Sequence, residues 1–245
     1  MDIRDKRVVI TGSNRGLGRA LALACLRAGA REVVAGARDV SSLASLQTEA
    51  GELGARLVPV RLDVRVQAEV DDVARLGRAD ILINNAGMAT FGGVLGANFA
   101  AIEEEVQVNY LGILRMVRAL APAMAEHGDG LIVNVASALG KVNMPMIGTY
   151  SALKAALLSL GHGLRGELQG RGVRVVTVCP ATLDTDMTKD LPTAKMPTPL
   201  AAQEILDAIA QEPVEVPIGD EARGVFAEFE RDARALQNAF LQARF

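Results

Sequence analysis

The sequence predicts one three-layer α/β domain, in which helices cover both faces of a doubly wound parallel sheet. Short aliphatic, β-branched runs alternate along the chain with Ala- and Leu-rich segments of helical period, which is typical of parallel strands joined by right-handed crossovers. The runs are continuously apolar, as strands are when helices bury both of their faces. The 245 residues, 50% of them hydrophobic, suffice for a single large core.

Each expected element follows from this pattern in chain order. Strands are predicted at residues 8–10, 32–35, 56–61, 81–83, 131–135 and 173–178. Helices are predicted at residues 16–28, 101–126 and 151–169. Residues 183–199 contain three prolines and few large apolar side chains, so we expect a long substrate loop there that acts as a lid. The remaining expected elements are a helix at 201–210, a short strand at 214–218 and a C-terminal helix at about 221–243.

The composition argues against several kinds of partner. The net charge is −3 and the arginines lie mostly among acidic residues, so no basic face for nucleic acid is expected. The chain shows no secretory signal, and no apolar run is long enough to span a bilayer, so we expect a cytoplasmic protein without membrane contact. Cys25 and Cys179 lie in apolar runs and are expected to be buried free thiols. His127 and His162 lack ligand-like neighbours, so no metal site is expected.

A glycine-rich loop lies between the first strand and the first helix. Gly12 permits a tight turn, Gly16 lets the backbone approach a pyrophosphate, and Gly18 lets the helix pack on the sheet. The free N–H groups and the positive end of the helix dipole would then meet the phosphates. Glycines alone also occur in ordinary tight turns, but this position in the fold favours a dinucleotide site. The loop residues expected to contact the cofactor are Gly12, Ser13, Asn14, Arg15, Gly16, Leu17 and Gly18.

The end of the second strand selects between the two nicotinamide dinucleotides. NAD sites carry an acidic residue near this strand end, which binds the ribose 2′-hydroxyl. Here Ala37 occupies that place and Arg38 follows it, and a guanidinium suits a 2′-phosphate because it donates paired hydrogen bonds. Arg15 is a candidate for a second clamp. We therefore predict NADP, with NAD as the alternative because a shift of one residue would make Asp39 the ribose-binding acid.

Tyr150 and Lys154 lie four positions apart on a predicted helix, so they share one face. A free tyrosine has a pKa of about 10, which is unsuitable for proton transfer at neutral pH. A neighbouring ammonium and the positive charge of an oxidised nicotinamide would favour the phenolate, making Tyr150 a usable acid or base. Such a pair taken alone is usually an ordinary surface pair.

Ser137 strengthens the catalytic interpretation of this pair. It stands just past the strand at 131–135, at the sheet edge where open parallel sheets bind ligands. Its hydroxyl could hydrogen-bond a substrate oxygen and stabilise the charge that develops there. The structural alternative is that Ser137 caps a turn or helix.

Together these segments resemble a classical short-chain dehydrogenase/reductase, over residues 8 to about 187. The resemblance implies a Rossmann-like fold and NADP-dependent hydride transfer between a nicotinamide and a carbonyl or alcohol. It rests on the glycine loop and on matching residues further along the chain, which are Asp63, Asn84, Asn85, Ala86, Gly87, Asn109, Ser137, Tyr150 and Lys154.

The resemblance also implies roles for residues at the matching positions. Asp63 is expected to contact the adenine, with a backbone contact from Val64. Asn109 is expected to hold a water that links Lys154 to solvent, and Lys154 to bind the nicotinamide ribose as well. Other residues implied to contact the cofactor are Asn85, Ala86, Gly87, Tyr150, Pro180, Leu183 and Thr185. The chain departs from the family where Pro180-Ala181 replaces Pro-Gly, and after residue 218, where the common Asp-Gly-Gly ending is missing.

The resemblance further implies a homodimer or homotetramer, formed by the helices at 101–126 and 151–169. The second helix carries small residues that permit close helix approach, namely Ala155, Ala156, Ser159, Gly161 and Gly163. Three segments, residues 87–93, 138–149 and 183–199, are predicted to surround the nicotinamide. Apolar ketones or aldehydes are the expected substrates, because six flexible or aromatic side chains fall in these segments. These side chains are Met88, Phe91, Met144, Met146, Met187 and Met196. The alternatives are an NAD-dependent alcohol dehydrogenase of the same family and a non-catalytic NADP-sensing regulator.

Overall fold

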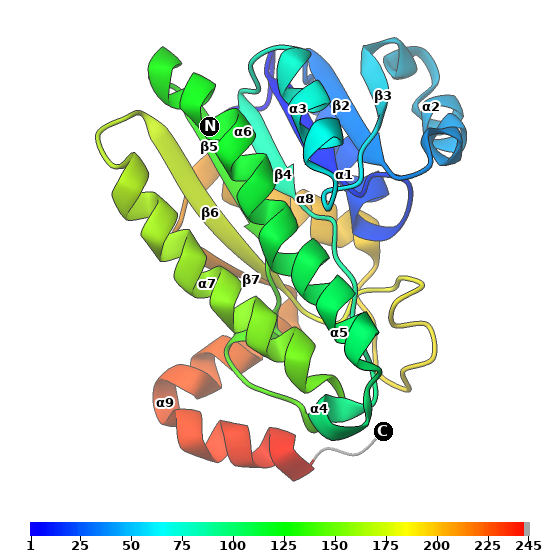
Figure 1. The fold of residues 1–245 in the computed structure, drawn as a ribbon. Helices are drawn as coiled ribbons and strands as arrows, with labels where there is room; N and C mark the ends of the chain where they lie inside the picture. The colour runs from blue at the N-terminus through cyan, green and yellow to red at the C-terminus, as the bar shows by residue number, and fades with distance from the viewer. Residues whose placement is uncertain (243–245) are drawn as a thin grey trace.

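Seven parallel strands form one sheet in the order β3-β2-β1-β4-β5-β6-β7 (Figure 1). The computed structural model describes residues 1–242. The strands are β1 (Arg7–Thr11), β2 (Glu32–Ala37), β3 (Leu57–Arg61), β4 (Ile81–Asn84), β5 (Gly130–Val135), β6 (Val173–Pro180) and β7 (Glu215–Ile218). The strand order runs outward in both directions from the β1–β4 pair, so the loops that leave these two strands diverge and open a crevice. The predicted doubly wound parallel sheet is confirmed.

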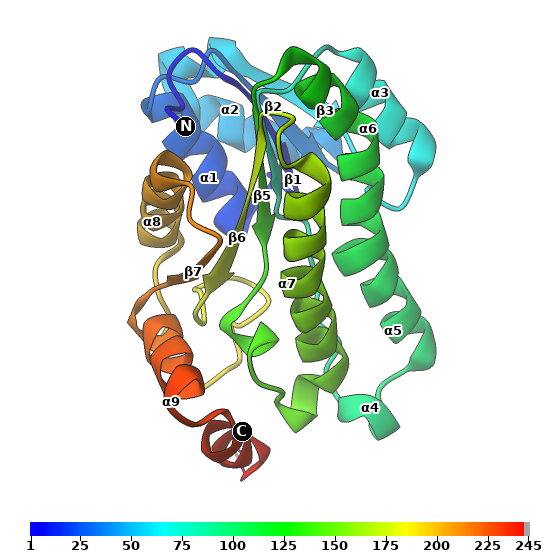
Figure 2. The ribbon, with the colours of Figure 1, turned by 90° about the vertical axis from the view of Figure 1, so that its left-hand side faces the viewer.

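Helices cover both faces of this sheet, with α1 and α8 on one face and α3, α6 and α7 on the other (Figure 2). The helices are α1 (Gly16–Arg27), α2 (Ala44–Ala50), α3 (Gln67–Arg75), α4 (Gly93–Gly96), α5 (Phe99–Val106), α6 (Gly112–His127), α7 (Gly148–Leu168), α8 (Thr198–Gln211) and α9 (Asp220–Gln242). Each face holds its own aliphatic core, which explains the continuously apolar strands. No helix within residues 1–242 is long and apolar enough to cross a membrane.

Several short helical segments were not predicted from the sequence. They are the 3₁₀ turns η1 (Val40–Leu43), η2 (Gly51–Arg56), η4 (Ala138–Gly140) and η5 (Pro145–Ile147), together with α2, α3 and α4. Each spans fewer than ten residues, and α2 buries a single side chain, Leu46. A repeat of 3.6 residues is hard to recognise over so short a segment.

The helix predicted at residues 101–126 differs from the expectation in two ways. It begins earlier, at Phe99, because the Asn98 side chain accepts hydrogen bonds from the N–H groups of Ala100 and Ala101 and caps its N-terminus. A π-helical turn, η3 (Gln107–Leu111), also separates α5 from α6. Such turns often occur at functional sites, and this one contains Asn109.

The C-terminal elements correct two further boundaries. The loop predicted at 183–199 ends at Pro197, because Thr198 and Pro199 open α8, and proline is favoured in the first turn of a helix. The C-terminal helix is α9, which is kinked at Asp232 rather than continuous, with φ −157° and ψ 86° there. The Asp232 carboxylate accepts a hydrogen bond from the N–H of Ala235 at 2.9 Å and so caps the second arm. Residue 243, where the predicted helix ended, lies outside the described residues.

The two arms of α9 hold two of the segments expected to surround the substrate. Glu221 in the first arm accepts hydrogen bonds from the N–H and hydroxyl of Thr182. Gln237 in the second arm exchanges two hydrogen bonds of 2.8 Å with the backbone of Asn143. The C-terminal helix therefore braces the segments that follow β5 and β6.

Candidate active site

The glycine loop has the conformation that a dinucleotide site requires. Gly12 has a φ of +70°, which favours glycine. A Cβ on Gly18 would lie 2.0 Å from the Gly12 carbonyl oxygen, so the approach of α1 to the loop requires glycine there as well. The N-cap residue of α1, Arg15, makes no side-chain capping hydrogen bond, which leaves the first N–H groups of the helix for an anion. Ser13 and Leu17 are buried, and the Ser13 N–H and hydroxyl already donate to the carbonyl oxygens of Gly36 and Ile10, each at 2.9 Å.

The segment after β4 is tied directly to this loop. The Thr11 hydroxyl accepts hydrogen bonds from the N–H groups of Asn85 and Ala86, at 3.0 and 2.9 Å. The Asn85 amide donates in return to the carbonyl oxygens of Thr11 and Gly12, at 3.0 and 3.1 Å. The two loops on either side of the crevice therefore form one rigid unit.

The residues after β2 show how the two candidate cofactors could be distinguished. Asp39 uses its carboxylate locally, because Oδ1 accepts hydrogen bonds from the N–H and hydroxyl of Ser41 at 3.0 and 2.7 Å. These hydrogen bonds lower the pKa of Asp39. Arg38, in contrast, is 66% exposed and lies 4.0 Å from Glu104. A guanidinium is therefore available at the position predicted for a 2′-phosphate clamp.

Arg65 was not singled out from the sequence, although it adjoins the predicted adenine site. It forms an ion pair of 2.6 Å with Asp63 and a second one with Glu104. The Arg65 hydrogen bonds lower the pKa of Asp63 despite partial burial. Since Arg65 and Arg38 both approach Glu104, this rim of the crevice carries two guanidinium groups. The signal available in the sequence was a basic residue two positions after Asp63.

Tyr150 and Lys154 lie on α7, and the Lys154 Nζ is 5.4 Å from the centre of the Tyr150 ring. Lys154 is buried and donates a hydrogen bond of 2.8 Å to the carbonyl oxygen of Val135, the last residue of β5. This contact fixes the ammonium at the carboxyl end of the sheet. The predicted pair is thus located beside the crevice rather than on an outer face of α7.

The pKa shifts of this pair arise from burial. Burial raises the pKa of Tyr150 to about 12, although the Ser137 hydroxyl acts in the opposite direction. Burial lowers the pKa of Lys154 to about 8. The tyrosine shift is opposite to the one expected from the Tyr–Lys spacing, because loss of water around the phenol outweighs the neighbouring polar groups. Both groups are therefore shifted towards their neutral forms.

Ser137 and Asn109 are both anchored to backbone groups. The Ser137 Oγ accepts a hydrogen bond of 3.2 Å from Leu139 and caps the turn η4 (Ala138–Gly140), which leaves its proton available as a donor. The buried Asn109 amide exchanges hydrogen bonds of 2.9 and 2.7 Å with the backbone of Met88. This exchange leaves one amide hydrogen and one lone pair of Asn109 for other partners.

The segment after β6 lies against the glycine loop. A Cβ on Gly16 would come within 3.2 Å of the Thr185 methyl group, and Arg15 forms an exposed ion pair of 2.9 Å with Asp186. The carbonyl oxygen of Leu183 accepts a hydrogen bond from the Thr188 hydroxyl, so the turn after β6 is well defined. A cavity of about 370 Å³ is lined by residues of the glycine loop, of α1 and of this segment as far as Lys189.

Comparison with known proteins identifies this arrangement. The family model described as short chain dehydrogenase matches residues 6–196. The chain belongs to the short-chain dehydrogenase family. The matched range contains the whole crevice described above, whereas α8, β7 and α9 lie beyond it.

Relatives in this family have several activities. A ketoacyl reductase from Nostoc sp. is 35% identical over 76% of this chain and 66% of its own length. A 3-oxoacyl-[acyl-carrier-protein] reductase from Thermotoga maritima is 31% identical over 82% of this chain and 83% of its own. A short chain dehydrogenase from Burkholderia cenocepacia, solved in complex with NADP, is 36% identical over 99% of this chain and 100% of its own, with a TM-score of 0.92. A short chain dehydrogenase/reductase from Burkholderia phymatum, solved in complex with NAD, is 26% identical over 96% of this chain and 93% of its own, with a TM-score of 0.84.

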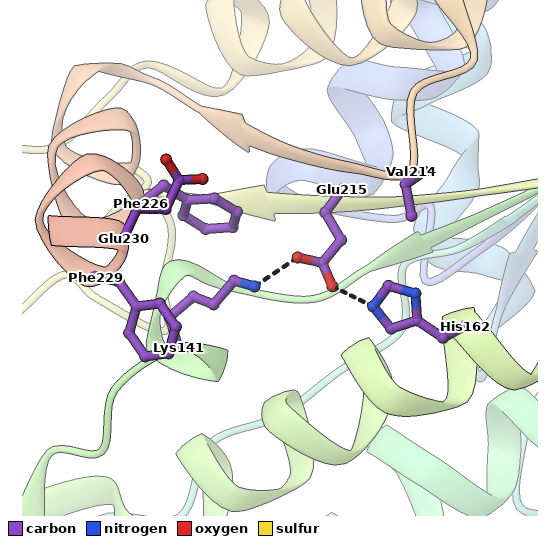
Figure 3. A pocket seen from close by; sticks show the side chains of 7 residues that line it. All are labelled: Lys141, His162, Val214, Glu215, Phe226, Phe229 and Glu230. Atoms are coloured by element: carbon purple, nitrogen blue, oxygen red, sulfur yellow. Dashed lines mark hydrogen bonds and ion pairs between the residues drawn. The ribbon is translucent and has the colours of Figure 1, made fainter. Parts of the chain in front are cut away.

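A second cavity, of about 280 Å³, lies between α7, β7 and α9 (Figure 3). Glu215 of β7 is held there between Lys141, at 2.6 Å, and His162, at 2.9 Å. The Lys141 ammonium also lies 5.0 and 5.6 Å from the ring centres of Phe226 and Phe229 on α9. Lys141 directly follows the turn capped by Ser137, so these contacts attach that turn to β7 and α9. In this short-chain dehydrogenase, the side chains that line the cavity thus help to fix the turn that carries Ser137.

Glu215→Gln should destabilise the fold at neutral pH. Burial opposes ionisation of Glu215, but Lys141 and His162 hold its pKa below the ordinary 4.5. A lowered pKa contributes stability that is present above the unfolded-state pKa and is lost as the pH falls through the folded-state pKa. We expect a loss of about 1.5–3 kcal/mol at pH 7, typical of hydrogen bonds to a charged group, that shrinks below pH ~4.5. Denaturant unfolding across pH measures this difference.

Glu230 offers a matched control, because it lines the same cavity but is exposed. Glu230→Gln should change the free energy of unfolding by less than about 0.5 kcal/mol. Equal decreases in the free energy of unfolding of the two variants would contradict a specific contribution from Glu215.

Proposed function

We propose that this short-chain dehydrogenase is an NADP-dependent oxidoreductase that transfers a hydride between the nicotinamide and a carbonyl or alcohol. The observation that carries the proposal is the position of Tyr150 and Lys154 at the carboxyl end of β5, beside Ser137 and the crevice. The relatives named as reductases and dehydrogenases support the reaction class. Retention of Asn109, Ser137, Tyr150 and Lys154 argues against a non-catalytic NADP-sensing regulator.

The residues at the crevice suit the cofactor. The rigid glycine loop and the uncapped N-terminus of α1 would hold the pyrophosphate. Asp63, the backbone of Val64 and the segment 85–87 would line the adenosine, and Lys154 the nicotinamide ribose. Pro180, Leu183 and Thr185 would adjoin the nicotinamide, which supplies or accepts the hydride when bound.

The protein side chains supply the proton chemistry. In the reductive direction, Tyr150 donates its phenolic proton to the carbonyl oxygen, and in the oxidative direction its phenolate removes the alcohol proton. Ser137 donates a hydrogen bond to the same oxygen and stabilises its developing charge. Because burial keeps Tyr150 protonated over a wide pH range, the geometry favours its role as an acid in reduction. Asn109 and Lys154 would connect the tyrosine to solvent and restore its proton.

The surroundings of the second strand favour NADP. Asp39 is engaged with Ser41, whereas Arg38 is exposed and can pair with a 2′-phosphate. Arg15 could form a second clamp after leaving Asp186. The NAD-bound relative from Burkholderia phymatum keeps NAD-dependent alcohol oxidation as the second candidate.

The substrate class is inferred from the walls of the crevice. Phe91, Met146 and Met187 are 44%, 41% and 40% exposed, and they come from the three segments expected to surround the nicotinamide. Met144 is buried and Met196 packs against the core, so these two fill gaps instead. Three adaptable apolar groups still favour medium-sized apolar ketones or aldehydes over charged sugars.

Tyr150→Phe should abolish turnover while leaving the fold and NADP affinity intact, because it removes only the ionisable oxygen. We expect a loss of at least about 10²–10⁴-fold in turnover number, the range typical of general acid catalysis. A panel of carbonyl compounds and alcohols, followed by nicotinamide absorbance, measures the change. Tyr110→Phe, which alters the other tyrosine of the chain, should retain activity. Near-normal turnover by the Tyr150 variant would refute the mechanism.

Arg38→Ala should weaken NADP binding far more than NAD binding. Loss of one charge-assisted hydrogen-bonding group corresponds to about 1–3 kcal/mol. Calorimetric titration with both cofactors measures the difference. Arg75→Ala serves as the control, because Arg75 lies on α3, outside the predicted cofactor site, and is 70% exposed against 66% for Arg38. Equal losses for both cofactors would show that Arg38 does not read the 2′-phosphate.

We also propose a homodimer or homotetramer formed through α6 and α7. Gly161 does not contribute, since a Cβ there would meet the Thr177 hydroxyl of β6 at 2.5 Å. Ala155, Ser159 and Gly163 are exposed on the outer face of α7 and permit close helix approach. Light scattering at micromolar concentration should give a multiple of the monomer mass, and a monomer would contradict the proposal.

A further inference from the structure

Glu105 is a buried carboxylate in the last turn of α5, and it has no exposed surface. Its Oε1 accepts a hydrogen bond of 2.9 Å from the N–H of Thr90, in the segment that follows β4. Its Oε2 is also buried and has no hydrogen-bond partner among the described residues. Burying an ionised oxygen without a partner is costly, and a positive charge nearby reduces that cost.

The helix that carries Glu105 packs against the helix that carries the proposed catalytic pair. Asn109 follows four residues later, and α5 packs against α7, the helix that carries Tyr150 and Lys154. The charge of Glu105 acts on both of those groups. Ser151, which adjoins Tyr150, is likewise buried with an unpartnered hydroxyl. The two helices that pack together, α5 and α7, thus each bury an unpartnered polar oxygen, one of Glu105 and one of Ser151.

We propose that Glu105 is a positioning residue of the active site, whose buried carboxylate favours the ammonium of Lys154 and adds to burial in favouring the protonated phenol of Tyr150. The proposal rests on the function proposed above and adds a residue to it. Glu105 and Lys154 form no direct ion pair within the described part of the chain, so the carboxylate acts through the low-dielectric space between the helices.

Other titratable groups near the pair do not replace this charge. Burial raises the pKa of the Cys179 thiol to about 12, so it is neutral at physiological pH. Tyr110 lies in the adjoining turn η3 and is replaced by phenylalanine in the test below. Glu103 is exposed, and Glu104 pairs with Arg65 at the rim of the crevice. Glu105 is thus the carboxylate through which α5 acts on the pair.

The sign of the effect follows from the two protonation equilibria. A negative charge disfavours the phenolate of Tyr150 and favours the ammonium of Lys154, so it raises both pKa values. Removing the charge lowers both. A purely structural role, in which Glu105 only accepts the Thr90 hydrogen bond, would move neither, because glutamine keeps an oxygen for that bond.

The experiment compares Glu105→Gln with Glu103→Gln, which removes the same charge from an exposed position of the same helix. Both are made in a Tyr110→Phe background, where Tyr150 is the remaining tyrosine and the chain contains no tryptophan. Near-ultraviolet absorbance then reports ionisation of Tyr150 alone. The pH profiles of turnover in both directions report the protonation of Tyr150 and Lys154 together. We expect Glu105→Gln to shift the absorbance step and the profiles to lower pH by roughly one unit, with no shift for Glu103→Gln.

Two further variants keep the outcome decisive. Glu105→Asp should stay close to the parent profile because it retains the charge. Glu105→Met, whose apolar chain has a similar length, should reproduce the shift if the glutamine variant does not fold. An unshifted absorbance step in a folded Glu105→Gln or Glu105→Met variant would overturn the proposal. So would the finding that Glu105→Asp is the one variant of the three that folds. A shifted step in a chain without oxidoreductase activity would instead refute the reaction while supporting the role of Glu105.

Discussion

The hydrogen bonds between Thr11 and Asn85 are the interaction on which the rest of the site depends. They join the loops that leave β1 and β4, the two strands between which the sheet changes direction. Because these backbone groups are buried or half-buried, leaving any of them unpaired would cost about 1–3 kcal/mol. A Cβ on Gly18 would lie 2.0 Å from the Gly12 carbonyl oxygen and 2.5 Å from the Asn85 amide nitrogen, so this connection requires glycine there. A dinucleotide cradle therefore results from pairing backbone groups at the switch point of the sheet.

Burial at this edge of the sheet has a chemical consequence. It disfavours charge on both members of the Tyr150–Lys154 pair, raising the pKa of the first and lowering that of the second. A neutral phenol suits a proton donor, but a neutral amine would weaken the proposed relay. With a pKa of about 8, Lys154 stays mostly an ammonium at neutral pH, and its hydrogen bond to the Val135 carbonyl oxygen favours that form. The inferred role of Glu105 is to oppose the effect of burial on the same group.

The elements beyond the matched family range stabilise the segments near the substrate. Glu221 and Gln237 on α9 bind backbone groups after β6 and β5, and the Lys141–Glu215–His162 contacts attach the turn at Ser137 to β7 and α7. The NADP-bound structure from Burkholderia cenocepacia covers 99% of this chain, so this part of the architecture is shared with a solved relative. The segments that follow β5 and β6 are thus held by a region that the family model does not include.

The sequence alone determined the parallel sheet, the main helices, the glycine loop and the spacing of Tyr150 and Lys154, because alternation, helical period and loop chemistry are local properties. It did not determine the kink at Asp232, the capping role of Asp39 or the direction of the Tyr150 pKa shift. Those features depend on burial and on which polar groups reach a side chain once the fold has formed. Glu105 belongs to no local sequence motif, and only the tertiary structure buried it and packed its helix, α5, against α7, which carries the Tyr–Lys pair.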